Sequence, residues 1–158
     1  MICKTGHTFI KQKIRESDAL LGGEMSGHIF FNDRWPGFDD GIYAGARMLE
    51  IIANSEEDQF ESVPDMLSTP EINIPAADEE KFQIVKTFIE NSNFSDAKIL
   101  SIDGIRVEFE KGWGLLRPSN TSPCLVLRFE AETNDDLKKI KEIFYLGLKS
   151  IKPNINKF

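Results

Sequence analysis

The sequence predicts an α+β fold in which a C-terminal α-β-β-β-β-α unit follows the C-terminal portion of an α/β domain. Asp103-Gly104 separates two β-prone runs, KILSI (98–102) and IRVEF (105–109), and this is a strong signal for a tight antiparallel hairpin. Amphipathic helical patterns precede and follow this β-prone region. Together these observations predict a mainly antiparallel sheet with a helix at each end of the unit.

A boundary between the two units is predicted from the prolines that precede the first of these helices. Pro64, Pro70 and Pro75 fall among polar and small residues, and such segments commonly separate compact units. We therefore expect a first unit over residues 1–62, a linker over residues 63–77 and a second unit over residues 78–158.

The first unit begins with a predicted helix over residues 9–21 and a strand over residues 27–31. Pro36 and Gly37 then interrupt regular structure. Asp39 or Asp40 can cap the next helix, over residues 41–54. Its apolar residues share one face: Ile42, Ala46, Leu49 and Ile52. A single predicted strand cannot satisfy its own backbone groups, so we expect this unit to be incomplete on its N-terminal side.

The second unit begins with a predicted helix over residues 78–91. Three acids occupy its first turn, where they favour the helix dipole. Its expected buried stripe comprises Phe82, Val85, Phe88 and Ile89. After the hairpin, strands are expected at the start of residues 112–123 and over residues 124–131. Thr133 or Asn134 then caps a last helix, whose apolar positions are Leu137, Ile140, Phe144, Leu148 and Ile151.

Composition limits the class of protein. The 158 residues carry a formal net charge of −7, which argues against nucleic acid or an anionic membrane as the partner. No apolar run approaches the roughly 18 residues that a membrane span needs, and the N-terminus does not resemble a signal peptide. Cys3 and Cys124 have no metal-type spacing, so a reduced, cytoplasmic setting is expected and no metal site is predicted.

The stretch GGEMSGHIFF (22–31) is the first candidate site. Its two glycines are expected to form a turn that disfavours side chains. Glu24, Ser26 and His28 follow at alternate positions and would line one face of an extended backbone. This face offers donors and acceptors to a polyhydroxylated ligand, although an ordinary polar surface turn explains the same residues.

The stretch RPSNTSP (117–123) is the second candidate site. Arg117 supplies a planar fork suited to phosphate or carboxylate. Ser119, Asn120 and Thr121 add side-chain donors, and a turn here exposes backbone N–H groups to an anion. A hydroxyl-stabilised turn beside a solvated arginine is the alternative. If both stretches faced one cleft, a sugar phosphate could bind the first through its hydroxyls and the second through its phosphate.

Several motifs carry a resemblance to a known family. These are KTGH (4–7), GGEMSGH (22–28), RWPGFDDG (34–41), STPEI (68–72), KGWGLLRPSNTSP (111–123) and LVLRFEA (125–131). In this order, they closely resemble the C-terminal part of the bacterial phosphomannomutase/phosphoglucomutase branch of the α-D-phosphohexomutase family. Members have four domains around a central cleft, and the resemblance covers the end of domain 3 and all of domain 4, which implies a TBP-like fold for the second unit.

The resemblance implies a role for each candidate residue. Glu24 and Ser26 match residues that bind sugar hydroxyls, and Arg117, Ser119, Asn120 and Thr121 match the loop that holds the substrate phosphate. It also implies that His7 and His28 line the cleft near the reacting sugar. His28 is then a candidate general acid or base, because imidazole titrates near neutral pH.

The family reaction moves a phosphoryl group between the 1- and 6-positions of a hexose such as glucose or mannose, through a bisphosphorylated intermediate. The sequence contains neither a TASHNP-type serine loop nor a DGDGDR-type magnesium loop. The resemblance therefore implies that Mg²⁺ is bound outside this chain, that the N-terminal domains of the same enzyme are partners, and that these residues alone are inactive. Two alternatives remain: a stand-alone sugar-phosphate or anion-binding module, and an interaction domain that self-associates through the first unit.

Overall fold

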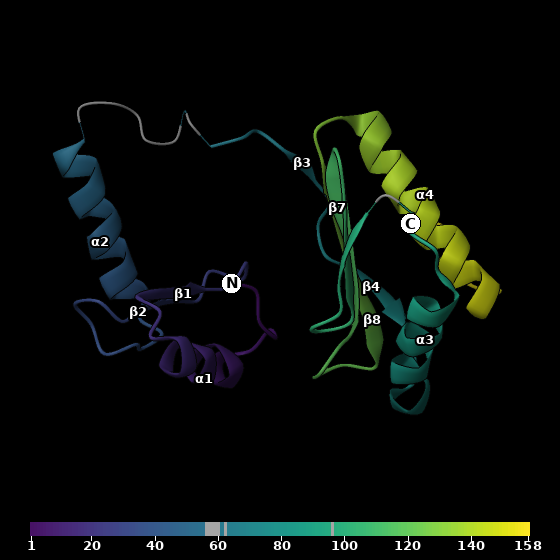
Figure 1. Cartoon of the computed structure of the whole chain (residues 1–158), viewed down its shortest axis with the longest axis horizontal. Helices are drawn as coiled ribbons and strands as arrows, with labels where there is room; N and C mark the ends of the chain where they lie inside the picture. The colour runs from purple at the N-terminus through teal and green to yellow at the C-terminus, as the bar shows by residue number, and fades with distance from the viewer. Residues whose placement is uncertain (56–60, 62, 96) are drawn as a thin grey trace. The chain divides into compact units, whose positions relative to one another are not determined.

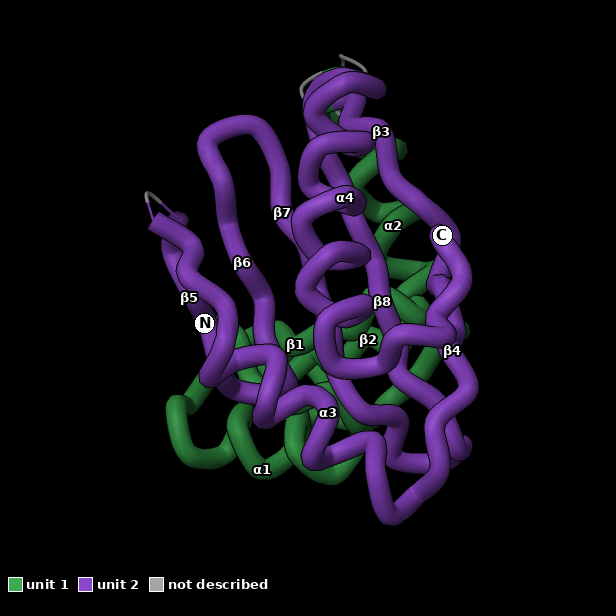
Figure 2. Tube along the Cα trace, turned by 90° about the vertical axis from the view of Figure 1, so that its right-hand side faces the viewer, with its two compact units in different colours: residues 1–64 green, residues 65–158 purple. Residues whose placement is uncertain are grey.

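In the computed structural model, residues 1–55, 61, 63–95 and 97–158 are described. The chain forms two compact units, Met1–Pro64 and Asp65–Phe158 (Figure 2). The mixed helix and strand content confirms the predicted α+β class. No helix in the described part of the chain combines the length and apolar character needed to cross a membrane.

Unit 1 is a small helix-and-hairpin assembly. Its elements are α1 (His7–Ser17), β1 (Leu21–Gly23), β2 (Ile29–Phe31) and α2 (Gly41–Asn54). Strands β1 and β2 pair in antiparallel register, with Leu21 opposite Phe31 and Gly23 opposite Ile29. Helix α1 lies along this hairpin, and α2 extends away from it (Figure 1). A small core of Ile10, Ile14 and Phe30 fixes α1 against the strands.

The glycine pair at residues 22 and 23 lies in strand β1 and does not form the turn. The turn glycine is Gly27, whose φ of 90° lies in the left-handed region that favours glycine. Gly22 is instead required by packing: a Cβ there would lie 2.8 Å from Ile14 Cδ1 and 2.9 Å from Ile10 Cγ2. The expected glycine turn was therefore wrong, because close helix packing selects glycine at this position.

Helix α2 has the predicted bounds, and Asp40 caps it by accepting a hydrogen bond from Tyr43 N at 2.9 Å. None of its residues is buried. Ile42 is 90% exposed, and the rest of the predicted apolar face is exposed too: Ala46, Leu49 and Ile52. Two strands cannot cover this helix, so its apolar face has no packing partner among the described residues.

Unit 2 is a six-stranded antiparallel sheet covered on one face by two helices (Figure 1). Its elements are β3 (Leu67–Ser68), β4 (Ile72–Pro75), α3 (Asp78–Asn91), β5 (Lys98–Leu100), β6 (Ile105–Phe109), β7 (Gly112–Pro118), β8 (Cys124–Ala131) and α4 (Asn134–Ile151). The strand order is β3-β8-β7-β6-β5, and β4 also pairs with β8. Each helix and long strand lies where the sequence predicts it.

The stretch expected as a linker contributes β3 and β4 to this sheet. In β4, Ile72 pairs with Leu127 and Ile74 with Leu125, and Ile74 enters the core. Pro75 ends the strand, where a missing backbone N–H does least harm. The alternation of apolar and polar residues in INIP is a strand signal that the neighbouring prolines obscured.

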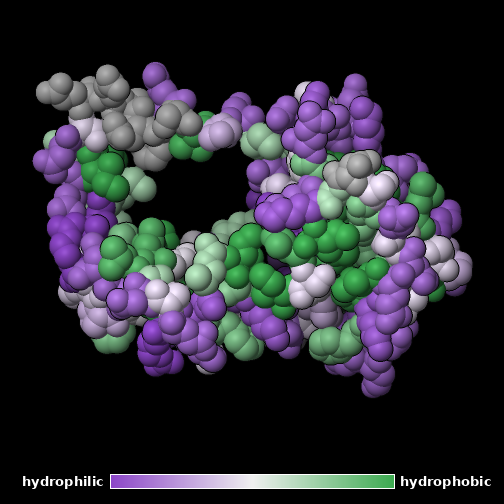
Figure 3. All heavy atoms as spheres, in the orientation of Figure 1, coloured by the Kyte–Doolittle hydropathy of each residue, from purple (hydrophilic) through white to green (hydrophobic). Residues whose placement is uncertain are grey.

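The core of unit 2 lies between the helices and the sheet, around Phe88, Phe129 and Phe144. Helix α4 is capped by Thr133, whose side chain accepts from Asp136 N at 3.2 Å, as predicted. The predicted stripe of α3 was partly wrong. Phe82 is 56% exposed, whereas Lys81 is buried with 4% of its surface accessible. Figure 3 shows hydrophobic residues grouped on unit 2. Ile99 in β5 and Ile102 shortly after it are among the exposed hydrophobic residues of this unit.

Candidate functional site

The GEMSGH residues form the tip of the β1–β2 hairpin. Gly27 N donates to Glu24 O at 3.0 Å, and Glu24 N donates to His28 O at 2.9 Å. The turn thus closes over residues 24–27, and Glu24 and His28 lie opposite each other at its base. The expectation of an extended backbone was therefore wrong, although the turn still brings these two side chains to the same end of the hairpin.

Glu24 connects this hairpin tip to the KTGH segment. Its Oε1 accepts a hydrogen bond from Gly6 N at 3.2 Å, and its Oε2 accepts one from the Ser26 hydroxyl at 3.0 Å. Gly6 is the N-cap residue of α1, so the Glu24 carboxylate satisfies a backbone donor at the start of that helix. Two stretches that lie apart in sequence thereby form one polar cluster.

Both histidines lie in this cluster and share one carboxylate. His28 Nδ1 lies 2.7 Å from Asp39 Oδ2, and His7 Nε2 lies 3.2 Å from the same oxygen. The imidazole rings meet edge to face with centroids 6.3 Å apart. Sequence reasoning considered Asp39 only as a helix cap. Because Asp40 caps α2, the DDG motif leaves Asp39 available for another contact. No sequence spacing indicates that this contact is with His28.

A group of ion pairs holds α2 to the loop that follows the hairpin. Arg47 Nη1 bonds Asp33 at 3.0 Å, and Arg34 forms a two-point pair with Glu50 at 3.0 and 2.7 Å. The Arg47 hydrogen bond, with help from the backbone at Arg34, lowers the pKa of Asp33 to about 2. The Arg34 hydrogen bond lowers the pKa of Glu50. The Arg47 guanidinium also lies 4.5 Å from the ring centroid of Phe31, so this group of ion pairs contacts strand β2.

In unit 2, Arg117 lies near the end of β7, before a loop of small polar residues. Its guanidinium forms no hydrogen bond or ion pair with the described residues. Gly104, with φ of 80°, lies against its backbone, and a Cβ there would be 2.6 Å from the Arg117 Cα. This close approach of the turn before β6 fixes the backbone of Arg117, while its guanidinium has no partner in the described part of the chain.

The Ser119 side chain is used within the loop. It is buried, and its Oγ accepts from Thr121 N at 3.3 Å and from Ser122 N at 3.1 Å. Two of the backbone N–H groups expected to face an anion are therefore already bonded. Asn120 and Thr121 are exposed. The structure thus has the hydroxyl-stabilised turn that the sequence offered as an alternative, and this turn presents two polar side chains to solvent.

Lys81 is a residue that sequence reasoning missed. Its buried ammonium donates to Ser122 O at 3.1 Å and to Asp78 Oδ1 at 2.6 Å. Because Ser122 lies in the loop, Lys81 connects the first turns of α3 to it. A lysine at a position next to a helical apolar stripe carries no sequence signal for this contact.

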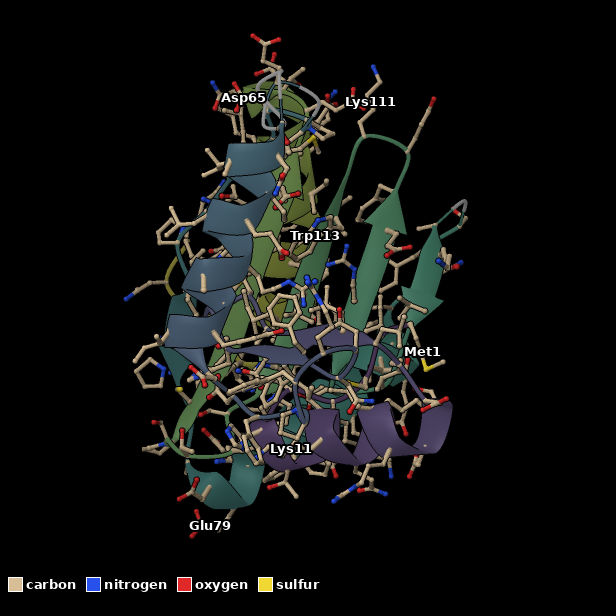
Figure 4. All side chains as sticks on the ribbon, turned by 90° about the vertical axis from the view of Figure 1, so that its left-hand side faces the viewer. Met1, Lys11, Asp65, Glu79, Lys111 and Trp113 are labelled. Atoms are coloured by element: carbon tan, nitrogen blue, oxygen red, sulfur yellow. The ribbon has the colours of Figure 1, made fainter. Side chains whose placement is uncertain are left out.

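Gly114 of β7 lies against Phe144 of α4, so the alternate residues Trp113, Leu115 and Arg117 lie on the sheet face that the helices leave uncovered. Figure 4 labels Trp113 on this strand. The Arg106 guanidinium stacks over Trp113 at 3.8 Å from the ring centroid and pairs with Glu108 at 3.0 Å. The Arg106 guanidinium is therefore already in contact with neighbouring side chains of the sheet. Within the described ranges, no group of three or more His, Cys, Asp or Glu side chains is arranged to hold a metal ion.

Comparison with known families assigns both units. Residues 1–69 match the family described as "Phosphoglucomutase/phosphomannomutase, alpha/beta/alpha domain III". Residues 71–146 match "Phosphoglucomutase/phosphomannomutase, C-terminal domain". The chain belongs to the phosphoglucomutase/phosphomannomutase family. This confirms the resemblance predicted from the motifs, and it places the hairpin cluster in domain III and the Arg117 loop in the C-terminal domain.

Individual relatives agree with this membership in the phosphoglucomutase/phosphomannomutase family. A phosphomannomutase/phosphoglucomutase of Pseudomonas syringae is 53% identical over 156 residues, which cover 97% of this chain and 34% of that protein. A phosphoglucomutase of Neisseria gonorrhoeae is 46% identical over 151 residues, 93% of this chain and 33% of that protein. The chain therefore spans about a third of the length of the curated relatives it matches.

A solved structure supports the fold as well. The crystal structure of a phosphoglucomutase/phosphomannomutase family protein from Burkholderia thailandensis matches with a TM-score of 0.89 and 44% identity. The match covers 99% of this chain and 34% of that chain. Both units of the present chain thus have counterparts in one longer phosphoglucomutase/phosphomannomutase family protein.

Proposed function

We propose that this chain supplies sugar and phosphate recognition to a phosphohexomutase that interconverts hexose 1-phosphates and hexose 6-phosphates. The observation that carries the proposal is that one chain combines two kinds of groups. Unit 1 has a cluster of polar side chains that can bond to hydroxyls, and unit 2 has an arginine that is unpaired among the described residues and lies beside a polar loop. A hexose phosphate has groups that match each set.

The unit 1 cluster suits sugar hydroxyls. The Ser26 hydroxyl donates to the Glu24 carboxylate at 3.0 Å, and the remaining lone pairs of both groups can accept from vicinal sugar hydroxyls. His28 and His7 have about half of their side-chain surface exposed, at 52% and 51%. In this proposal His28 is the general acid or base, and His7 lies beside the reacting sugar.

The unit 2 loop suits the phosphate. Arg117 offers a planar fork for two phosphate oxygens, and charge-assisted bonds of this kind are roughly twice as strong as neutral ones. Asn120 and Thr121 add exposed donors. The buried Ser119 shapes the turn and is proposed to act through it. Because phosphoryl transfer depends mostly on positioning and charge, such contacts are a direct contribution to catalysis.

The phosphoryl-transfer groups are proposed to come from the remaining length seen in relatives. Magnesium would be bound there too, since the described residues provide no set of ligands for it, and no step here passes through a metal. The partners are then the hexose phosphate and the N-terminal domains of the same enzyme. A cytoplasmic setting agrees with this, as Cys3 and Cys124 are both free thiols.

An NMR titration of the ¹⁵N-labelled chain tests the proposal. Glucose 1-phosphate is expected to shift amide signals of residues 22–28 and of residues 117–123, whereas inorganic phosphate should shift only the second group. Absence of shifts in both groups with glucose 1-phosphate would contradict it. Shifts with free glucose alone would contradict the role of the Arg117 loop.

A mutase assay provides the complementary measurement. Conversion of glucose 1-phosphate to glucose 6-phosphate by the 158 residues alone is expected to be absent. Robust turnover would overturn the proposal that phosphoryl transfer requires further domains. Binding without turnover, and no effect of added N-terminal domains, would favour a stand-alone binding module instead.

We also propose that unit 1 associates with a second copy when no other domain covers it. The observation behind this is the exposed apolar face of α2, where Ile42, Leu49 and Ile52 are 90%, 67% and 52% exposed. Exposed apolar faces of this kind usually mark interaction surfaces. Sedimentation should show concentration-dependent association that a Leu49→Glu, Ile52→Glu double variant abolishes, and a monodisperse wild-type monomer would contradict it.

A further inference from the structure

Asp39 lies between the two imidazoles of unit 1 and contacts both through one oxygen atom. His28 Nδ1 is 2.7 Å from Asp39 Oδ2, and His7 Nε2 is 3.2 Å from it. The Asp39 side chain is only 20% exposed, against about half for each imidazole. Its backbone is fixed by an antiparallel bridge to Phe30, a fully buried residue of β2. The carboxylate is therefore held by the fold, and the histidines are arranged around it.

The contact atoms determine which nitrogen carries the proton on each neutral imidazole. An ionised carboxylate only accepts hydrogen bonds, so His28 Nδ1, which is hydrogen-bonded to Asp39 Oδ2 at 2.7 Å, must be the protonated nitrogen of that ring. His28 then has its proton on Nδ1 and a free lone pair on Nε2. His7 Nε2 lies 3.2 Å from the same oxygen, a charge contact that favours the proton on Nε2 of that ring. The Asp39 oxygen therefore favours opposite tautomers in the two rings.

Other contacts keep the rings from exchanging these roles. The His7 ring packs edge to face on Phe30 at a centroid separation of 5.2 Å and on His28 at 6.3 Å. His7 is also the first residue of α1, whose N-cap is bonded by Glu24. The His28 contact with Asp39 is 0.5 Å shorter than that of His7, from 2.7 and 3.2 Å. The carboxylate therefore determines the His28 tautomer more strongly.

We propose that Asp39 is a positioning residue that fixes His28 as the Nδ1-protonated tautomer and so presents its Nε2 as a hydrogen-bond acceptor for a sugar hydroxyl. This inference rests on the proposed function for its ligand, but the tautomer itself does not depend on that ligand. The same carboxylate stabilises the imidazolium when Nε2 takes up a proton, as in other carboxylate–histidine pairs.

The test is a long-range ¹H–¹⁵N correlation spectrum of the histidine rings, recorded on the whole chain without ligand. The spectrum is recorded at about pH 8.5, where free imidazole, with an ordinary pKa of about 6.5, is neutral. His28 should give the pattern of an Nδ1-protonated ring and His7 that of an Nε2-protonated ring. Wild-type His28 protonated on Nε2 would overturn the proposal without any variant.

Two substitutions separate positioning from general effects of charge. Asp39→Ala should convert His28 largely to the Nε2-protonated form, which neutral imidazole prefers in water, with a smaller change at His7. Asp40→Asn removes the same charge from the adjacent residue but retains a good helix cap, and it should leave both tautomers unchanged. An unchanged His28 pattern in a folded Asp39→Ala variant would overturn the proposal.

The ligand experiment keeps this inference distinct from the proposed function. If glucose 1-phosphate shifts no signals but His28 is protonated on Nδ1, the proposed function fails and the assignment of Asp39 stands. If glucose 1-phosphate binds while His28 is protonated on Nε2, the proposed function stands and the inference fails. If both hold, Asp39→Ala should weaken glucose 1-phosphate binding several-fold, whereas Asp40→Asn should not.

Discussion

The buried ammonium of Lys81 donates a hydrogen bond to the carbonyl oxygen of Ser122 at 3.1 Å and thereby connects helix α3 to the loop that follows Arg117. Lys81→Met retains the packing of the aliphatic stem but removes one of the two donors to that carbonyl, which also accepts from Cys124 N at 2.8 Å. We expect the free energy of unfolding to fall by about 1 kcal/mol, the net contribution of one lost hydrogen bond. Urea denaturation followed by circular dichroism measures this change.

Lys86→Met is the matched control for Lys81. Lys86 lies on the same helix but is exposed, and its contact with Glu90 is long, at 3.9 Å. Exposed pairs of this kind contribute little, so the control should change stability by less than about 0.5 kcal/mol. Faster amide exchange at Thr121 and Ser122 should appear only in Lys81→Met. Equal effects of the two substitutions would show that the loop does not depend on Lys81.

Gly22 and Gly23 provide a second matched pair. A Cβ on Gly22 would come within 2.9 Å of both Ile10 and Ile14, whereas a Cβ on Gly23 would meet only His28 O at 3.8 Å. Gly22→Ala should therefore destabilise unit 1 by about 1–3 kcal/mol through overpacking, and Gly23→Ala should be nearly neutral. Amide exchange along α1 reports the difference. Greater loss from Gly23→Ala would mean that backbone freedom, and not packing, selects glycine here.

Local patterns were sufficient for most of the fold. Helix α3 begins at Asp78 and ends at Asn91, as its acidic first turn and apolar spacing predict. The predicted hairpin of β5 and β6 forms, although β5 ends at Leu100 and the connection through Asp103-Gly104 is longer than the expected tight turn. Local patterns were not sufficient where pairing with a residue distant in sequence determines the structure. The alternation in INIP becomes a strand because β8 offers an edge to pair with, and nothing within INIP identifies β8.

The candidate site divides in the same way. Glu24, Ser26 and His28 are chemically conspicuous in sequence, and the turn brings Glu24 and His28 to opposite sides of its base. The sequence does not indicate the roles of Asp39 and Lys81, because each acts through a contact with a residue far along the chain. Lys81, for example, reaches Ser122 across 41 positions. Residue type suggests a ligand, but these positioning contacts exist only in the folded chain.

Acid should weaken the contact between α2 and the loop before it. The Arg47 hydrogen bond lowers the pKa of Asp33 from 3.8 to about 2, and the Arg34 hydrogen bond lowers the pKa of Glu50 below 4.5. A carboxylate whose pKa is lower in the folded protein than in the unfolded chain stabilises the fold at pH values above its unfolded pKa. This stabilisation is lost as the pH falls through the folded pKa. Amide shifts of α2 should therefore stay constant above about pH 5 and change below about pH 4.

A substitution assigns this acid response to the ion pair. Asp33→Asn removes the titrating carboxylate, so the part of the α2 response that follows Asp33 should disappear, and its side-chain ¹³C signal confirms the assignment in wild type. Glu16→Gln in α1 breaks an exposed pair with Lys13 of 3.6 Å and should leave the α2 response unchanged. A full response in Asp33→Asn would assign the transition to other carboxylates.

Arg117 should dominate phosphate binding because its guanidinium is unpaired among the described residues, while Arg106 is stacked on Trp113 and paired with Glu108. Arg117→Ala is expected to raise the Kd for inorganic phosphate about 10- to 100-fold, corresponding to roughly 1.5–3 kcal/mol for hydrogen bonds to a charged group. Arg117→Lys retains the charge but loses the two-point fork, so it should recover only part of the affinity. Chemical-shift titration of residues 117–123 measures all three proteins.

Lys111→Ala removes the same charge from the β6–β7 turn at the opposite end of β7 (Figure 4). It should leave the Kd for phosphate nearly unchanged at moderate salt, where exposed charges more than a Debye length of about 10 Å away are screened. A loss equal to that of Arg117→Ala would mean that phosphate responds to net charge and not to a built site. A loss confined to Arg117 makes its guanidinium the anion-binding group of unit 2, which is the contact that the proposed sugar-phosphate recognition requires.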